Sequence, residues 1–183
     1  MNQAVLKLFQ RLQDSHSKLI SELDKIEPKI LEQSPSGGKW SVTQVMYHLN
    51  TAESLSVLYV SKKRLGAEQL KPTGIIHQLK LFIARIAFYL PYKYRAPRVL
   101  GVMPEHVSYG EIKNTWLETR KKLGALLESL PEDELSKPIF RQPFFGYWNI
   151  FQMLKFMQIH FNRHRLQIRK TEENIQSLSE KPK

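Results

Sequence analysis

The chain has 183 residues, a net charge of +11 and no cysteine, which excludes disulfides, thiolate metal ligands and a cysteine nucleophile. Hydrophobic residues make up 42% of the sequence, enough for a packed core, and the length fits a single domain over residues 1–183. No apolar run approaches the roughly 20 residues of a membrane-spanning helix, and the N-terminus lacks the apolar stretch of a signal peptide. We therefore expect a cytoplasmic protein.

The first two helices are indicated by apolar periodicity and by a start signal. Apolar residues recur at helical spacing over residues 3–26, which predicts the first helix. A second helix is expected to begin at Ser41, because Gln44 stands where it can complete a capping box. Trp40 can pack on Val45 as a hydrophobic staple. This helix should end near Gly66.

Residues 67–107 are the least regular part of the sequence. A shorter amphipathic helix is expected within 75–90, and the residues after it are interrupted by prolines and a glycine. A long insertion in a compact domain often has a function, such as covering a site.

Two further long helices complete the pattern. One should begin at Ser108, with Glu111 completing a second capping box, and the other at Asn149, with Gln152 in the same role. The last helix should reach about residue 170 and be followed by a polar, frayed tail from about 171. No strand pair is evident. Four amphipathic helices joined by loops predict an all-α protein built as a four-helix bundle.

The positive charge is concentrated between residues 60 and 100. That stretch has nine Lys or Arg and a single acid, so it carries +8 of the net +11. Such a segment attracts phosphates, acidic lipids or anionic small molecules, and a solubilising surface explains the charge equally well. Tyr89, Tyr92 and Tyr94 beside Lys93 and Arg95 would suit contact with a membrane surface or a nucleic acid.

Three histidines suggest a metal site. His160 and His164 are four residues apart, which places them on one face of a helix. That pair alone is also explained by two hydrogen-bonded histidines at the bundle edge. His48, however, lies in the apolar stripe of another helix, and leaving a buried imidazole nitrogen unpaired costs about 1–3 kcal/mol. A divalent ion would satisfy His48, His160 and His164 together, and three histidines plus an open position are typical of a catalytic site.

The remaining candidates are weaker. His16, His77 and His106 lack such a setting. Glu53 could serve as a general base or support a metal ligand, although a surface or inter-helix polar residue is the simpler interpretation. Gln167 lies on the same helical line as the histidine pair. The sequence contains no nucleophile elbow, P-loop or dinucleotide fingerprint.

Two sequence runs resemble motifs of the DinB-like (YfiT-like) superfamily. The run KWSVTQVMYHL at 39–49 resembles the motif of its second helix. The run PFFG at 143–146, together with HFNRHRLQI at 160–168, resembles the motif of its fourth helix. A histidine often precedes the turn in this family, and this chain has Gln142 there.

The resemblance implies a four-helix bundle with up-down-down-up connections that is often a homodimer. The implied metal ligands are His48, His160 and His164, and the implied metal is zinc or nickel. Some relatives carry out transfer reactions with low-molecular-weight thiols such as bacillithiol or mycothiol.

These features are compatible with two classes of function. One is a metal-dependent enzyme, either a transferase that joins a small anionic thiol to an electrophile or a hydrolase that activates water. The other is a non-catalytic protein, which binds a metal or uses the basic segment 60–100 to bind a membrane surface or nucleic acid.

Overall fold

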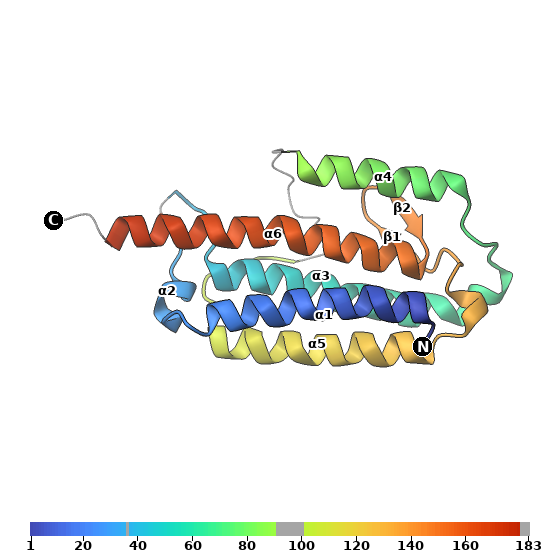
Figure 1. Cartoon of the computed structure of the whole chain (residues 1–183), viewed down its shortest axis with the longest axis horizontal. Helices are drawn as coiled ribbons and strands as arrows, with labels where there is room; N and C mark the ends of the chain where they lie inside the picture. The colour runs from blue at the N-terminus through green and yellow to red at the C-terminus, as the bar shows by residue number, and fades with distance from the viewer. Residues whose placement is uncertain (36, 91–100, 180–183) are drawn as a thin grey trace.

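Four long helices form the bundle in the computed structural model, which describes residues 1–35, 37–90 and 101–179. They are α1 (Gln3–Leu23), α3 (Val42–Lys63), α5 (Tyr109–Ser129) and α6 (Ile150–Ser179). In Figure 1, α1 and α6 run in one direction and α3 and α5 in the other. The all-α, up-down-down-up architecture is therefore confirmed.

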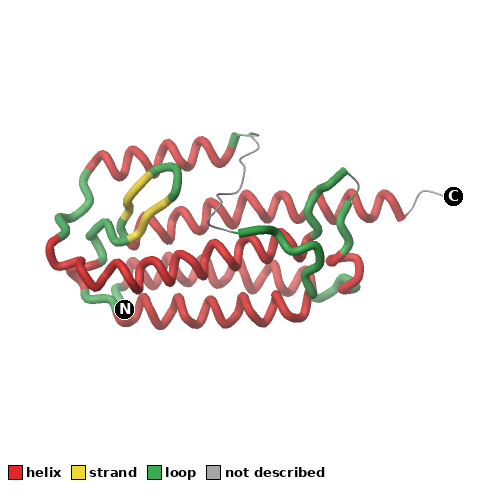
Figure 2. Tube along the Cα trace, turned by 180° about the vertical axis from the view of Figure 1, so that it is seen from behind, coloured by secondary structure: helices red, strands yellow, loops and turns green. Residues whose placement is uncertain are grey.

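Short elements connect these helices. They are α2 (Pro28–Glu32), the 3-10 helices η1 (Arg64–Gln69) and η3 (Glu132–Glu134), and α4 (Ile75–Tyr89). Two three-residue strands, β1 (Phe140–Gln142) and β2 (Gly146–Trp148), form an antiparallel hairpin. Figure 2 shows this hairpin in yellow between α4 and the bundle. The expectation that the chain has no strand pair was wrong.

The core lies between the inward faces of the four long helices. Each contributes apolar side chains at helical spacing, and most are fully shielded from solvent. The largest of these are Trp116 of α5 and Phe161 of α6, together with leucines of α1, α3 and α5, and Trp148 of β2 is also fully buried. This packing fixes how α3 and α6 face each other, which is what positions the histidines.

The starts of α3 and α6 are capped as the sequence predicts. The Ser41 hydroxyl accepts the Gln44 N–H at 3.1 Å, and Gln44 Oε1 accepts the Ser41 N–H at 2.9 Å. Asn149 and Gln152 exchange the equivalent bonds at 2.9 and 3.0 Å. Both capping boxes hold the beginning of a helix that carries candidate site residues.

A backbone N–H group at the start of α5 finds its hydrogen-bond partner in a different way. Ser108 precedes the helix, but its side chain makes no capping hydrogen bond, so the predicted capping box with Glu111 is wrong. Instead, the N–H of Tyr109 donates to Glu32 Oε1 of α2 at 2.8 Å. A carboxylate from a neighbouring helix thus takes the place of the local cap, and its negative charge suits the helix N-terminus.

The last helix is longer than expected. A frayed tail from about residue 171 was predicted, yet α6 continues to Ser179. Thr171 and Ile175 are buried, at 6% and 5% exposure, and they continue the inward line of Ile168 at helical spacing. The exposed polar residues of this segment lie on the outward face of α6.

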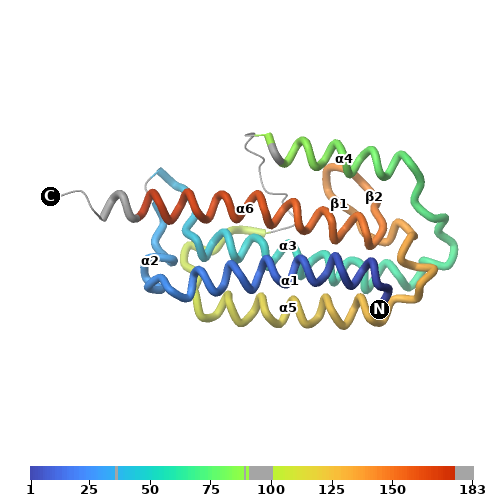
Figure 3. The backbone as a smooth tube through the Cα atoms, viewed as in Figure 1, coloured from blue at the N-terminus to red at the C-terminus, as the bar shows by residue number. Residues whose placement is uncertain are grey.

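The predicted short helix in the insertion is confirmed as α4, which packs on α6 outside the bundle, as Figure 3 shows. Its entry is fixed by Thr73, which accepts a hydrogen bond from Asn149 and donates its N–H to the Ser136 carbonyl. Residues 91–100, with Tyr92, Lys93, Tyr94 and Arg95, lie outside the described residues. Among the described residues, the structure has no helix long and apolar enough to cross a membrane.

Candidate metal centre

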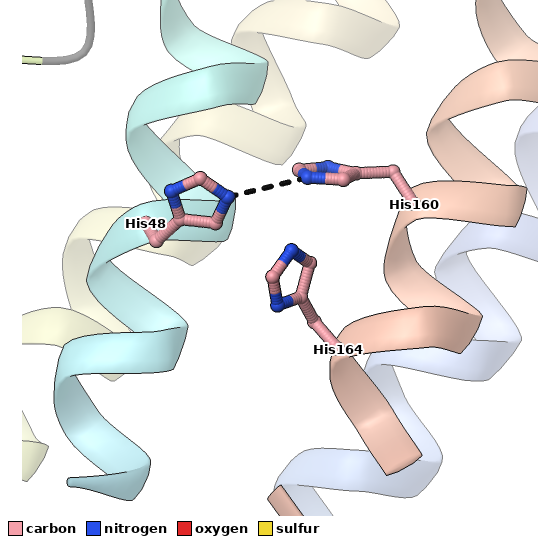
Figure 4. A group of neighbouring side chains, drawn as sticks. All are labelled: His48, His160 and His164. Atoms are coloured by element: carbon pink, nitrogen blue, oxygen red, sulfur yellow. Dashed lines mark hydrogen bonds between the residues drawn. The ribbon is translucent and has the colours of Figure 1, made fainter. Parts of the chain in front are cut away.

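His48 of α3 and His160 and His164 of α6 converge on one point between the two helices, as Figure 4 shows. The Nε2 atoms of His48 and His160 are 3.2 Å apart. One donor nitrogen from each of the three residues lies within 4.8 Å of the others. His48 is 7% exposed, and the other two are partly buried. A sequence separation of more than 100 residues is therefore closed by the packing of α3 on α6.

Gln167 orients one of the three rings. His164 Nδ1 lies 2.9 Å from Gln167 Oε1, one turn along α6. Because an amide oxygen only accepts, Nδ1 carries the proton and the lone pair of Nε2 is free to face the other histidines. Such a bond from the remote ring nitrogen is the usual support of a histidine that binds a metal.

Aromatic side chains wall the cluster. The ring of Phe156 stacks on His160 with centroids 5.8 Å apart and planes inclined by 11°. Phe88, at the end of α4, meets His160 edge-on at 6.0 Å, and Trp40 lies 5.4 Å from His48. These rings shield the imidazoles from water on several sides.

Burial keeps the histidines neutral. It lowers the pKa of His48 to about 4. For His164, burial has the largest effect and electrostatic repulsion by His48 the next. Together they lower the pKa of His164 to about 3, against a smaller opposing effect of its hydrogen bond with Gln167. The pKa of His160 is also lowered well below its ordinary value, mainly by burial. At neutral pH all three imidazoles are therefore neutral, with one N–H and one free lone pair, the state in which histidine binds a metal.

The spacing of the nitrogens suits a divalent ion. Tetrahedral zinc with Zn–N bonds of about 2.0–2.1 Å requires ligand nitrogens about 3.3 Å apart. The His48–His160 separation of 3.2 Å already matches, and side-chain rotations would bring in His164, since no pair exceeds 4.8 Å. Three neutral imidazoles are a suitable donor set for zinc or nickel.

Arg163 links α4 to the helix that carries His160 and His164. Its Nη1 donates to the carbonyls of Phe88 and Leu90 at 2.6 and 3.0 Å, which holds the end of α4 against α6. Its positive charge also contributes to lowering the pKa of His160 and His164. The end of α4 therefore lies beside the histidines, and that the insertion covers a site stays a prediction.

Glu53 is not part of the centre. It is 3% exposed and forms an ion pair with Arg120, with Oε2 2.7 Å from Nε and Oε1 accepting from Nη2 at 2.8 Å. Oε2 also accepts from Trp116 Nε1 at 2.9 Å. Five residues along an α-helix turn Glu53 about 140° away from His48. Glu53 is therefore a polar residue that links two helices, which is the simpler of the two interpretations given for it in the sequence analysis.

The other histidines lie elsewhere. His16 is buried against Trp116, with ring centroids 4.5 Å apart, and burial, then the charge of Arg120, lower its pKa to about 4. His77 Nδ1 accepts the Gly74 N–H at the start of α4, and the His106 side chain is 70% exposed. Gln142 accepts the N–H groups of Phe144 and Phe145, so it shapes the hairpin turn.

The aromatic wall was not anticipated from sequence. Phe156 precedes His160 by one helical turn, a signal that could have identified it. Phe88 has only a weak signal, its place on the inward line of Leu81 and Ala84, because its position depends on how α4 docks.

Fold and geometry together define a four-helix bundle with a buried cluster of three neutral histidines open to a metal. The sequence model of the DinB superfamily matches residues 8–168, so the chain belongs to the DinB superfamily. It is also 25% identical over 158 residues to the uncharacterized protein YuaE of Bacillus subtilis (strain 168), an alignment that covers 85% of this chain and 91% of YuaE. No solved structure matches the chain significantly.

Proposed function

We propose that this protein binds one divalent ion through His48, His160 and His164 and uses it to transfer a small anionic thiol to an electrophile. The observation that carries the proposal is the convergence of three neutral imidazoles whose donor nitrogens lie within 4.8 Å of one another. Three protein ligands leave a coordination position for a substrate. Zinc or nickel is the expected ion.

The thiol is favoured by the chemistry of the site. A divalent ion held by the three histidines would favour the thiolate form of a bound thiol, which would supply the nucleophile that this cysteine-free chain lacks. In the reaction the sulfur bonds to the electrophilic carbon, the leaving group departs with its electron pair, and the thiol proton goes to solvent. The aromatic wall limits the access of water, which would compete with sulfur.

Positive charge near the cluster supports an anionic thiol. Arg163 directly precedes His164 in α6, and its charge adds a small contribution, after burial and the neighbouring histidines, to the lowered pKa of His160 and His164. A thiol with carboxylates, such as bacillithiol, would gain more from this field than a neutral thiol.

The test is thiol conjugation by the metal-loaded protein. Bacillithiol and a generic alkylating electrophile are supplied, and thioether formation is compared between the wild type and His160→Ala, with His77→Ala as the matched control. We expect His77→Ala to keep the wild-type rate and His160→Ala to lose it. Equal rates for wild type and His160→Ala would remove the transferase proposal.

Hydrolysis is the competing reaction for the same residues. Metal-dependent cleavage of an ester or amide by the wild type, without thioether formation, would assign the protein to that class instead. A metal bound without either reaction would leave a metal-binding protein. We also expect a homodimer, which light scattering of the purified protein tests.

A further inference from the structure

The outward face of α4 is a continuous apolar stripe. Its members are between 48% and 88% exposed: Ile75, Ile76, Leu79, Phe82, Ile83 and Ile86. At 100° per residue they share an arc of about 120° on the helix. The opposite face, with Leu81, Ala84 and Phe88, is buried. The helix is therefore apolar on both sides, and among the described residues only its inner side is covered, by the bundle (Figures 1 and 3).

Positive charges border the stripe on both edges. On the same wheel, Lys80 falls just beyond Ile76, and Arg85 falls beyond Phe82 on the other side. The sequence has no Asp or Glu from 69 to 104, a stretch that contains the whole helix. Long basic side chains beside an apolar stripe can lay their stems along it and extend their charges to an anionic surface.

We propose that α4 is an interfacial helix that docks this protein on an anionic membrane surface. Its outward stripe would enter the boundary between headgroups and acyl chains, while Lys80 and Arg85 contact lipid phosphates. The helix is neither long nor apolar enough to cross a membrane, which agrees with binding in the plane of the surface.

A second copy of the chain fits the stripe less well. A helix of 15 residues is about 22 Å long, so one face about 10 Å wide offers roughly 200 Å². A standard interface buries about 800 Å² on each partner. The basic residues that border the stripe would also repel their counterparts on the α4 of a second copy, whereas an anionic bilayer complements them.

Docking through α4 would bring the metal centre close to the lipid surface. The inner face of the same helix touches the cluster through Phe88, and Arg163 clamps its end to α6. Membrane binding does not require the metal, so it stands apart from the proposed transferase activity.

The experiment is co-sedimentation of the full-length protein with vesicles of phosphatidylcholine and phosphatidylglycerol, or of phosphatidylcholine alone. Ile83→Gln is compared with Leu117→Gln on α5, because these side chains are equally exposed, at 48% and 47%. A Lys80→Gln/Arg85→Gln variant tests the charges. Circular dichroism checks that every variant keeps the helical fold.

We expect the wild type and Leu117→Gln to bind the anionic vesicles and to bind less as salt is raised. Ile83→Gln should weaken binding about tenfold or more, since a buried isoleucine is replaced by a polar side chain. The charge variant should weaken binding to anionic vesicles, and neutral vesicles should bind poorly.

Four results would overturn the proposal. The first is no sedimentation of the wild type with anionic vesicles, and the second is full binding by Ile83→Gln. The third is a wild-type dimer that Ile83→Gln converts to a monomer in light scattering, which assigns the stripe to a second copy. The fourth is oligonucleotide binding that Ile83→Gln alone abolishes, which assigns it to nucleic acid.

Discussion

Arg120→Met tests the structural role assigned to Glu53. Arg120 and Glu53 are 0% and 4% exposed at their side chains, and the guanidinium pairs with both carboxylate oxygens at 2.7 and 2.8 Å. Methionine fills much of the same volume but leaves the buried carboxylate without its counter-charge. Breaking a buried ion pair by removing one partner costs about 3–5 kcal/mol. For a chain of this length, that corresponds to a melting temperature lower by about 6–20 °C.

The assay is urea unfolding monitored by circular dichroism, with the double variant Glu53→Leu/Arg120→Met as the control. The double variant should recover most of the loss, because an apolar pair leaves no buried charge. Glu53→Gln should leave metal affinity unchanged, since its carboxylate belongs to the contact of α3 with α5. The reasoning is refuted if Arg120→Met costs less than about 1 kcal/mol, or if Glu53→Gln abolishes metal binding.

Three further outcomes are expected. Gln167→Leu should weaken metal affinity about 10–100-fold without unfolding the protein, because it removes the bond that orients His164; a calorimetric titration that finds wild-type affinity would contradict this. His16→Leu should make the free energy of unfolding of the metal-free protein less dependent on pH between about 4 and 6.5. The pKa of His16 is about 4 in the folded protein and 6.5 ordinarily, so the wild type has its full stability above pH 6.5. As the pH falls toward 4, up to about 3 kcal/mol of that stability is lost. Unfolding curves with the same pH slope for wild type and variant would disprove this role of His16. Ser41→Ala should cost about 1 kcal/mol, whereas Ser108→Ala should be nearly neutral because Ser108 makes no capping bond; equal losses in denaturant unfolding would show that the two caps are equivalent.

The parts of the fold that local chemistry dictates could be predicted. The Ser41–Gln44 and Asn149–Gln152 boxes are short-range motifs, so four residues are enough to indicate two helix starts. The convergence of the histidines could be expected as well, because His48 lies in an apolar stripe and must face the core.

The features that sequence reasoning missed depend on contacts distant in sequence. The cap of α5 comes from Glu32 of another helix, which no local pattern announces. The hairpin has strands of only three residues, and its turn is held by the Gln142 side chain, so alternation is too brief to detect. The extension of α6 depends on burial of Thr171 and Ile175 within a segment whose composition is polar.

The most direct test of the central claim is a titration of the metal-free protein with zinc and nickel, with elemental analysis of the resulting complex. We predict about one ion per chain for the wild type, and severe loss of affinity in each of His48→Ala, His160→Ala and His164→Ala. His16→Ala and His77→Ala should keep the wild-type affinity. If all five variants bind the ion as tightly as the wild type, the three converging histidines are structural and the proposed metal centre is wrong.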